Sequence, residues 1–593
     1  MFTTRPTLRG TFGMASSTHW LASATAMAVL EDGGNAFDAA VAAGFVLHVA
    51  EPHLNGPAGE VPIILAPAGT NPRVLCGQGP APAGATIEHY TSLGLDLVPA
   101  TGPLASAVPG AFDAWMLLLR DHGTKRLSEV LTYAIGYAEQ GCPAVGRIGE
   151  TVETVRHLFE TEWTTSAEVY LRDGKAPEAG RLLRNPALAA TWKRLIAEAE
   201  AAGPGRETQI DAARRVWREG FIAEELATAA AESTMDSSGE RHAGTLTGAD
   251  LAAFSAHYEQ PATYEWNGWT VAKAGLWSQG PAFLQQLALL PDGLEYGSPA
   301  YLHTLVENSK LAMADREAWY GDSADVSLDT LLSPDYNEHR RTLVGEEASL
   351  ELRPGSPDGR EPRLSEHTRR VLSGASPDVP PGAGEPTVAM DVAMNGVTRG
   401  DTCHVDVADR WGNMISATPS GGWLQSNPVI PALGFPLGTR LQMVWLQPGL
   451  PNSLAPGKRP RTTLSPSLAL RGGEAVMAFG TPGGDQQDQW QVHFFLAVAL
   501  GGLDLQGAID APNWHQDGFP SSFYPRPMHP GRLVIESRIG EDTIGELRRR
   551  GHRVVTGAPW SEGRLCAVAR DPETGLLSAG ANPRGMQGYA AGR

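Results

Sequence analysis

Hydroxyl side chains mark both ends of the segment GDTCHVDVADRWGNMISATPSGG, which runs from residue 400 to 422. Its alternation of apolar and polar residues predicts a strand, a tight turn around Trp411 and a returning strand. With the turn centred there, Thr402 and Ser420 lie roughly opposite each other across the ladder. Two hydroxyl groups are therefore expected to face each other at the strand ends.

The segment before this hairpin, residues 352–400, includes RPGSPDGREPR and SGASPDVPPGAGEP. Such a Pro-, Gly- and charge-rich stretch buries too little apolar surface to offset its ordering entropy, so we expect it to be flexible. Cleavage between Asp401 and Thr402 would give Thr402 a free α-amino group beside its own hydroxyl. That pairing lets an N-terminal threonine serve as its own base and nucleophile. On this stretch alone, the alternative is a surface linker followed by an ordinary hairpin.

The glycine pair in GTPGGD, residues 480–485, is a second candidate for chemistry. It follows a predicted strand and precedes a helical pattern that begins near Gln489. Gly483 and Gly484 could leave backbone N–H groups free to hold a developing oxyanion, because residues without side chains permit close approach. The motif matches neither common phosphate-binding glycine pattern. We expect Asp485 to cap the helix.

Three other polar residues are weaker candidates. His404 and Asp406 alternate on the predicted strand without a third ligand nearby in sequence, so a packed or hydrogen-bonded role is expected rather than a metal site. His515, in APNWHQDGFPSSF, either lines a substrate mouth or lies on a surface loop. The sequence indicates no cofactor.

Composition limits the class of protein. The chain has 593 residues and a net charge of -19, from 47 Lys and Arg against 66 Asp and Glu, which argues against a nucleic-acid partner. Its 4 scattered cysteines are too few for a disulfide framework and fit a reducing compartment. The N-terminal residues lack the apolar core of a secretory signal, and no later stretch resembles a membrane span. We therefore expect a cytoplasmic protein with no membrane partner.

The elements that must position these residues fall into two parts. Helical patterns dominate residues 1–344, with helices expected at 21–30, 38–47, 127–139 and 301–319. After residue 402 short β-runs appear at 467–470 and 475–479, and helices are expected at 492–500 and 543–550. A helix-rich first part is thus followed by a mixed, sheet-building second part.

Taken together, these stretches resemble the γ-glutamyltranspeptidase family of N-terminal nucleophile hydrolases. The joint order of the motifs carries the resemblance: EDGGNAFDAAVAAGFVLHVAEPHLNGPAG, SAVPGAFDAW, LTGADLAAF, MADREAWYGD, DTCHVDVADRWGNMISAT, GKRPRTTLSPSLAL, GTPGGD and NPRGMQGY. It implies an α/β, four-layer αββα sandwich and a proenzyme that cuts itself before Thr402. The products would be a large subunit of residues 1–401 and a small one of 402–593, together forming one intertwined unit. A homo-oligomer of such heterodimers is left open.

The resemblance also assigns roles residue by residue. Thr402 matches the nucleophile, Ser420 the hydroxyl that supports it, and Thr418 a neighbouring strand hydroxyl. The oxyanion donors match Gly483 and Gly484. Where the family has two serines that bind the glutamyl α-carboxylate, this chain has Thr462 and Thr463. The resemblance therefore implies that the reaction chemistry is retained.

The residues that would recognise a γ-glutamyl group differ from the family pattern. Gln78 aligns with the arginine that grips the α-carboxylate, and Met443 or its neighbour Val444 aligns with the acidic partner of the α-amino group. Without that carboxylate, a desolvated substrate ammonium would be left unpaired, which would weaken the binding free energy by about 1–3 kcal/mol. Arg440, where the family has a polar amide, and Gly422, where it has an asparagine, are further departures.

These departures predict the substrate class. The guanidinium fork of Arg440 suits a carboxylate, so we expect a small-molecule acyl or amide substrate that carries a carboxylate and lacks a free α-amine, such as a glutaryl or oxalyl compound. The alternative is that Arg440 pairs with an acidic residue of the pocket wall. Because no acceptor site is evident, hydrolysis is favoured over acyl transfer. Other readings are a carbon-carbon bond hydrolase of antibiotic biosynthesis, a true γ-glutamyl hydrolase or transpeptidase, and a non-catalytic binding relative.

Overall fold

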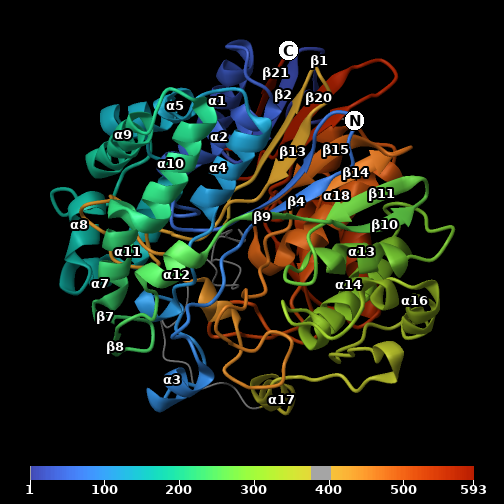
Figure 1. Ribbon diagram of the computed structural model, residues 1–593. Coiled ribbons are helices and arrows are strands. Elements are labelled where there is room, and N and C mark those ends of the chain that lie inside the picture. The colour runs from blue at the N-terminus through green and yellow to red at the C-terminus, as the bar shows by residue number, and fades with distance from the viewer. Residues whose placement is uncertain (1, 375–401, 586) are drawn as a thin grey trace.

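Two seven-stranded sheets form the centre of the computed structural model, which describes residues 2–374, 402–585 and 587–593 (Figure 1). The first sheet has the strand order β1 (Leu8–Gly10), β20 (Leu577–Ala581), β19 (Cys566–Arg570), β15 (Glu474–Gly480), β14 (Ser467–Arg471), β11 (Trp269–Lys273) and β10 (Ala262–Trp266). The second sheet has the order β21 (Tyr589–Gly592), β2 (Gly13–Ser17), β12 (Val405–Asp409), β13 (Met414–Ala417), β3 (Val61–Ala66), β4 (Arg73–Gly77) and β9 (His257–Glu259). All pairs within these two sheets are antiparallel.

Both sheets draw strands from both sides of residue 402. Strands β2, β3, β4 and β9 join the β12–β13 hairpin and β21 in one sheet, and β1, β10 and β11 lie at the two ends of the other. The first part of the chain is thus rich in helices but also supplies four of the seven strands of one sheet and three of the seven of the other. This confirms the prediction of one intertwined unit.

Helices cover the outer face of each sheet, which completes the predicted αββα sandwich. The second sheet packs against α1 (Trp20–Glu31), α2 (Ala36–Ala50), α4 (Ala111–His122) and α5 (Leu127–Gln140). The first sheet packs against α13 (Gly280–Ala288), α14 (Pro299–Trp319) and α18 (Gln487–Ala499). In Figure 1 the two helical layers lie to the left and right of the strands.

Helix α2 shows why the sequence folds this way. The Asn35 side chain accepts hydrogen bonds from the N–H groups of Phe37 and Asp38, and the Asp38 carboxylate accepts one from the Asn35 backbone N–H, so a capping box starts the helix. Every residue from Ala36 to Ala50 is buried, as the nearly uninterrupted run of small and apolar residues predicts. The helices expected from the sequence all occur, with boundaries shifted by a few residues; the last of them is α20 (Glu541–Arg549).

The prediction that residues 352–400 lack structure is wrong for the part that the structure describes. This part contains η2 (Pro357–Gly359) and α17 (Glu366–Leu372). Backbone hydrogen bonds secure it: the N–H of Gly355 donates to the buried Asp315 carboxylate at 2.6 Å, and the Trp319 indole donates to the Gly355 carbonyl at 3.0 Å. Polar partners elsewhere in the fold therefore compensate for the scarcity of apolar residues. The remainder, up to and including Asp401, lies outside the described residues.

Among the described residues, no helix is long and apolar enough to cross a membrane.

Candidate active site

The β12–β13 hairpin brings Thr402 and Ser420 together, as predicted. The two residues form an antiparallel bridge, and the Thr402 hydroxyl donates to Ser420 Oγ at 3.3 Å. Both side chains are buried. The bridge extends the ladder beyond Val405, which pairs with Ala417, so the hairpin register fixes which hydroxyls meet.

A buried ion pair supports Ser420. Arg440 begins η3 (Arg440–Met443) and donates from Nη2 to Ser420 Oγ at 3.0 Å. The same guanidinium pairs through Nε and Nη2 with the carboxylate of Glu60. Glu60 in turn exchanges two backbone hydrogen bonds with Ser420, at 2.9 and 3.0 Å. The structure therefore shows the arrangement in which Arg440 pairs with a carboxylate of the pocket wall.

Next to this ion pair the wall is apolar. Met443 is fully buried and contacts Trp423 and Phe523, and its sulfur lies 3.4 Å from Arg440 Nη1. The Arg440 guanidinium also lies 5.4 Å from the centre of the Trp423 ring, a cation–π contact. The position that aligns with the family's acidic residue therefore offers no charge to a substrate ammonium.

The glycine loop after β15 has a backbone conformation that favours glycine. Gly483 and Gly484 have φ angles of 124° and 53°, and a Cβ on Gly483 would lie 2.3 Å from the Trp490 ring. Neither backbone N–H donates to an acceptor within the described part of the chain. Two adjacent free N–H groups in a buried loop can stabilise a developing negative charge.

The prediction that Asp485 caps the following helix is wrong. The caps are Gly483 for η4 (Gly484–Gln486) and Gln486 for α18, and neither makes a side-chain capping hydrogen bond. Asp485 instead pairs with Arg316 and accepts from Ser522 Oγ at 2.6 Å. Both members of this ion pair are buried, so removing either one would leave an unpaired buried charge beside the glycine loop.

Thr462 and Thr463 lie beside this loop. The N–H of Gln279 donates to the Thr462 carbonyl at 2.9 Å, and Gln279 Nε2 donates to the Gly484 carbonyl at 3.3 Å. One glutamine thus joins the two segments. Thr463 Oγ1 is buried and has no hydrogen-bond partner among the described residues, so it is available to a ligand oxygen.

Gln78 directly follows β4, in the same sheet as the hairpin. Its Nε2 donates to the Gly79 carbonyl at 3.1 Å, and it lines a cavity of about 590 Å³ with Val108, His257 and Arg459. Val61 pairs with Gly77 in register, and the residue before Val61, Glu60, forms a bridge with Ser420. Gln78 therefore lies two strands from Ser420 in the same sheet, and within the described part of the chain it makes no hydrogen bond to Thr402, Ser420 or Arg440.

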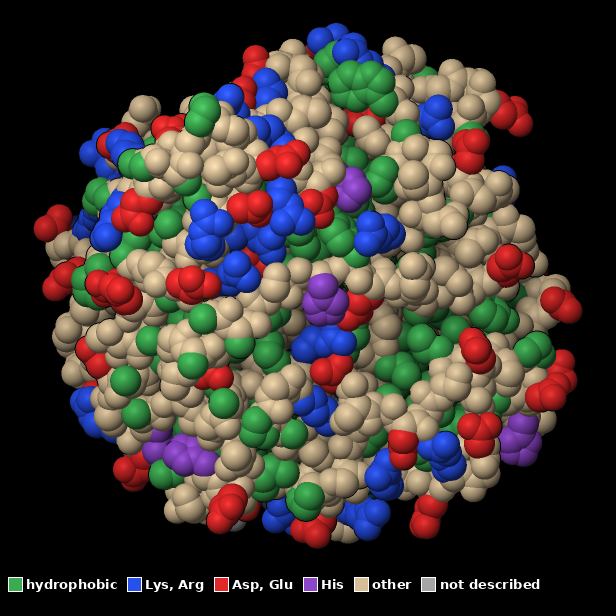
Figure 2. Space-filling model, in the orientation of Figure 1, with side chains coloured by type: hydrophobic (Ala, Val, Ile, Leu, Met, Phe, Trp, Pro, Cys, Tyr) green, Lys and Arg blue, Asp and Glu red, His purple; other side chains and the backbone are tan. Residues whose placement is uncertain are grey.

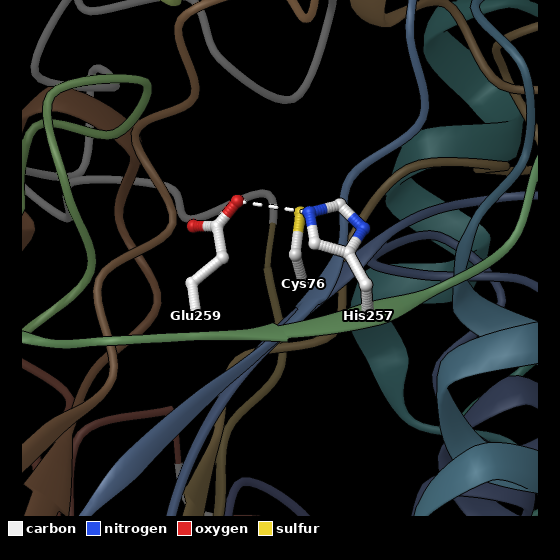
Figure 3. Close-up of side chains that lie close together, drawn as sticks. All are labelled: Cys76, His257 and Glu259. Atoms are coloured by element: carbon white, nitrogen blue, oxygen red, sulfur yellow. Dashed lines mark hydrogen bonds and ion pairs between the residues drawn. The ribbon is translucent and has the colours of Figure 1, made fainter.

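The same cavity borders a cluster of Cys76, His257 and Glu259, whose donor atoms lie within 4.8 Å of one another (Figure 3). His257 Nε2 lies 3.0 Å from Glu259 Oε1, and Arg459 Nη1 donates to Cys76 Sγ at 3.1 Å and to Glu259 Oε1 at 2.6 Å. Burial raises the pKa of the Cys76 thiol to about 11. Because a guanidinium already occupies the space among these donors, the cluster is better suited to hold an ion pair than a metal ion.

The packed, hydrogen-bonded role predicted for His404 and Asp406 is confirmed. His404 Nδ1 lies 3.0 Å from Thr418 Oγ1 and its Nε2 lies 2.8 Å from Asp406 Oδ1, and all three side chains are fully buried. The hairpin register was the signal that could have revealed this chain, because placing Thr402 opposite Ser420 also places His404 opposite Thr418. His515 is neither a rim nor a surface residue: it lies buried in β16 (Trp514–Gln516) and pairs with Glu562 at 2.6 Å.

The face of the molecule shown in Figure 2 carries charges of both signs. Lys and Arg side chains lie there among Asp and Glu side chains rather than in a separate patch.

Comparison with known proteins shows which family the chain resembles. Residues 22–592 match the γ-glutamyltranspeptidase family. An oxamate amidohydrolase proenzyme from Klebsiella pneumoniae subsp. pneumoniae is 31% identical over 604 residues, which cover 98% of each chain. A solved structure of LmbA2991 with a threonine-to-alanine substitution is 72% identical, with a TM-score of 0.95 over 100% of both chains. A cephalosporin acylase from Bacillus halodurans is 25% identical, with a TM-score of 0.81 over 100% of this chain and 97% of its own.

The relatives are named as hydrolases, amidohydrolases and acylases, and the curated ones are proenzymes. With the sandwich fold and the family match across nearly the whole chain, they show that the protein is an enzyme of the γ-glutamyltranspeptidase family, within the N-terminal nucleophile hydrolases.

Proposed function

We propose that the chain is a proenzyme that cuts itself before Thr402 and then uses Thr402 as the nucleophile of an acyl or amide hydrolase. The subunits would be residues 1–401 and 402–593. The buried Thr402–Ser420 pair and the proenzyme names of the relatives support this proposal.

Maturation and catalysis would use the same hydroxyl. In the precursor, Thr402 Oγ attacks the carbonyl carbon of residue 401, the peptide C–N bond breaks, and the hydroxyl proton goes to the departing nitrogen. Water then hydrolyses the ester and leaves Thr402 with a free amine. In each later turnover that amine takes the hydroxyl proton, the N–H groups of Gly483 and Gly484 hold the oxyanion, and water resolves the acyl-enzyme.

The substrate would carry a carboxylate and no free α-amine. The observation that carries this is the Arg440–Glu60 pair: the carboxylate beside Ser420 is engaged by a guanidinium, so it is poorly placed to bind a substrate ammonium. Within the described residues, the hydrogen-bond partner of Arg440 Nη1 is the weak acceptor Met443 Sδ, so this nitrogen can turn to a substrate carboxylate, and Thr463 Oγ1 can donate to one. The 31%-identical relative is named for oxamate, whose oxalyl group has this pattern.

The substrate proposal is tested by comparing oxalyl-, glutaryl- and γ-glutamyl-anilides. We expect the oxalyl or glutaryl compound to be hydrolysed fastest. Replacing Arg440 alone would leave Glu60 buried and unpaired, so the informative variant is the double substitution Arg440→Gln with Glu60→Gln, which removes both charges. It should reduce the preference for these substrates at least about tenfold, and a γ-glutamyl preference in the wild type would contradict the proposal.

Product analysis with excess dipeptide distinguishes hydrolysis from acyl transfer. We expect the free acid to dominate, because the sequence gives no sign of an acceptor site of the family type. Dominant transfer to the dipeptide would refute this part of the proposal.

We also propose a cytoplasmic location. All 4 cysteines are buried free thiols, and Cys403, next to the nucleophile, donates to Glu51 at 3.1 Å. A reducing compartment preserves such thiols. Cell fractionation should recover the protein with the cytoplasmic markers; recovery from periplasm or medium would contradict this location.

A further inference from the structure

A stripe of polar side chains runs between the two sheets, away from Thr402. On β12 and β13 the apolar residues Val405, Val407 and Ile415 face the helices, so the residues between them face the first sheet. These form three cross-strand pairs, all at most 1% exposed: Thr402 with Ser420, His404 with Thr418, and Asp406 with Ser416. Burying polar groups in such an apolar interface lowers the stability of the fold unless each group has a hydrogen-bond partner.

The protonation of Asp406 sets the direction of the hydrogen bonds in this stripe. With Asp406 ionised, its Oδ1 can only accept, so Nε2 of a neutral His404 carries the proton of the 2.8 Å contact. Nδ1 is then an acceptor, and the contact at 3.0 Å must be donated by the Thr418 hydroxyl. Because the Thr418 hydroxyl donates its proton to His404, its oxygen can only accept hydrogen bonds from other neighbours.

Residues of the first sheet pack against these side chains and hold them in position. Gly480, at the end of β15, lies against the imidazole: a Cβ there would be 2.1 Å from His404 Cε1. Ser416 Oγ donates to the Phe479 carbonyl at 3.2 Å, so the other sheet holds the far end of the stripe. The charged groups near its other end are Arg440 and Glu60, which pair with each other beside Ser420. Cys403 and Glu51 lie on the opposite face of β12.

We infer that Asp406 and His404 are positioning residues that hold Thr418 as a hydrogen-bond acceptor for the α-amino group of Thr402, an inference that rests on the proposed function. For the amine to act as base, its lone pair must face the Thr402 hydroxyl, so its N–H bonds must be accepted elsewhere. The register places Thr418 Oγ on the same face as Thr402, one cross-strand pair away. The stripe would thus orient the base that cleavage creates.

The test uses the mature, cleaved protein and the most rapidly hydrolysed of the three anilides. In Asp406→Asn the new amide N–H can donate to His404 Nε2, which moves the ring proton to Nδ1 and frees the Thr418 hydroxyl to donate to the amine. We expect kcat to fall at least about tenfold with KM little changed. Because a donor favours the neutral amine, the acid limb of the kcat profile should move to lower pH.

A second set of variants avoids changing a buried charge. Thr418→Val removes the hydroxyl at nearly constant volume and should lower kcat as much as Asp406→Asn, whereas Thr418→Ser should largely restore it. The two losses should not multiply in the double variant, since both remove the same acceptor. Ser16→Ala is the matched control: Ser16 pairs with Asp406 in register and is buried, but its hydroxyl donates to the Gly580 carbonyl, so kcat should stay within about twofold.

The outcomes separate the inference from the proposed function. Hydrolysis by Thr402→Ala would overturn the proposed function. Normal cleavage and hydrolysis by the wild type, combined with an unmoved acid limb in Asp406→Asn or full activity in Thr418→Val, would overturn only the inference. Multiplying losses in the double variant would overturn it as well.

Discussion

The reacting region and the pocket wall of this molecule are built in different ways. In the reacting region, one hairpin register pairs Thr402 with Ser420 and His404 with Thr418, so neighbours in sequence become neighbours in space. In the wall, Arg440 meets Glu60 across 380 positions of sequence. Local patterning determines the first region and tertiary packing the second. Substitutions should therefore act differently on the two regions.

The largest expected effect comes from removing the nucleophile. Thr402→Ala should leave one band near 63.0 kDa on a denaturing gel where the wild type shows two, and should lower hydrolysis at least about a thousandfold. The expected cause is the loss of the attacking oxygen in both maturation and turnover. An intact wild-type chain with full activity would contradict this, and so would a cleaved variant.

The hairpin part of the site was predictable because strand register has a period of two, so one pair determines the others. The sequence therefore placed Thr402 opposite Ser420, as the structure has them. It could not show that Arg440 meets Glu60, because that contact depends on how a short 3-10 helix lies against a distant strand end. Asp485 was misassigned for a related reason: its partner Arg316 lies on α14, far away in sequence.

The fold shows the same division. Helices with long apolar runs, such as α2, were predictable from local pattern. Residues 352–374 were not, since their order depends on Asp315 and Trp319 of α14 rather than on their own composition. Secondary structure is thus predictable from the sequence where the apolar residues of a segment themselves show that it is buried.

A smaller effect should follow from filling the space behind His404. Gly480→Ala places a Cβ where only 2.1 Å separates it from the ring, and the ring is tethered at both nitrogens. We expect about 1–3 kcal/mol lower stability and at least about tenfold lower activity, measured by denaturant unfolding and anilide hydrolysis. Gly136→Ala in α5 is the matched control, because a Cβ there meets nothing within 4 Å. Its stability should be unchanged or raised by up to about 1 kcal/mol, and equal behaviour of the two variants would contradict the packing argument.

The smallest effect concerns acid, and it tests whether the reacting region depends on the helical layer behind it. His48 of α2 is buried with neither ring nitrogen hydrogen-bonded to a described residue, and burial lowers its pKa to about 3. Because the folded pKa lies below the unfolded value of 6.5, the neutral ring contributes stability above pH 6.5 that is lost as the pH falls toward 3.

The free energy of unfolding should therefore drop on acidification, with His48 contributing up to about 1.4 kcal/mol per pH unit. His48→Leu should remove this part of the pH dependence of the free energy of unfolding, measured by denaturant unfolding between pH 6.5 and 4.5.

His493 of α18, whose pKa burial lowers to about 4, lies in the opposite helical layer and serves as the comparison. Since α2 packs directly against β12, acid should reduce hydrolysis by the wild type more than by His48→Leu, while His493→Leu should protect stability without protecting activity. Equal protection of activity by both variants would show that acid unfolds the two layers together.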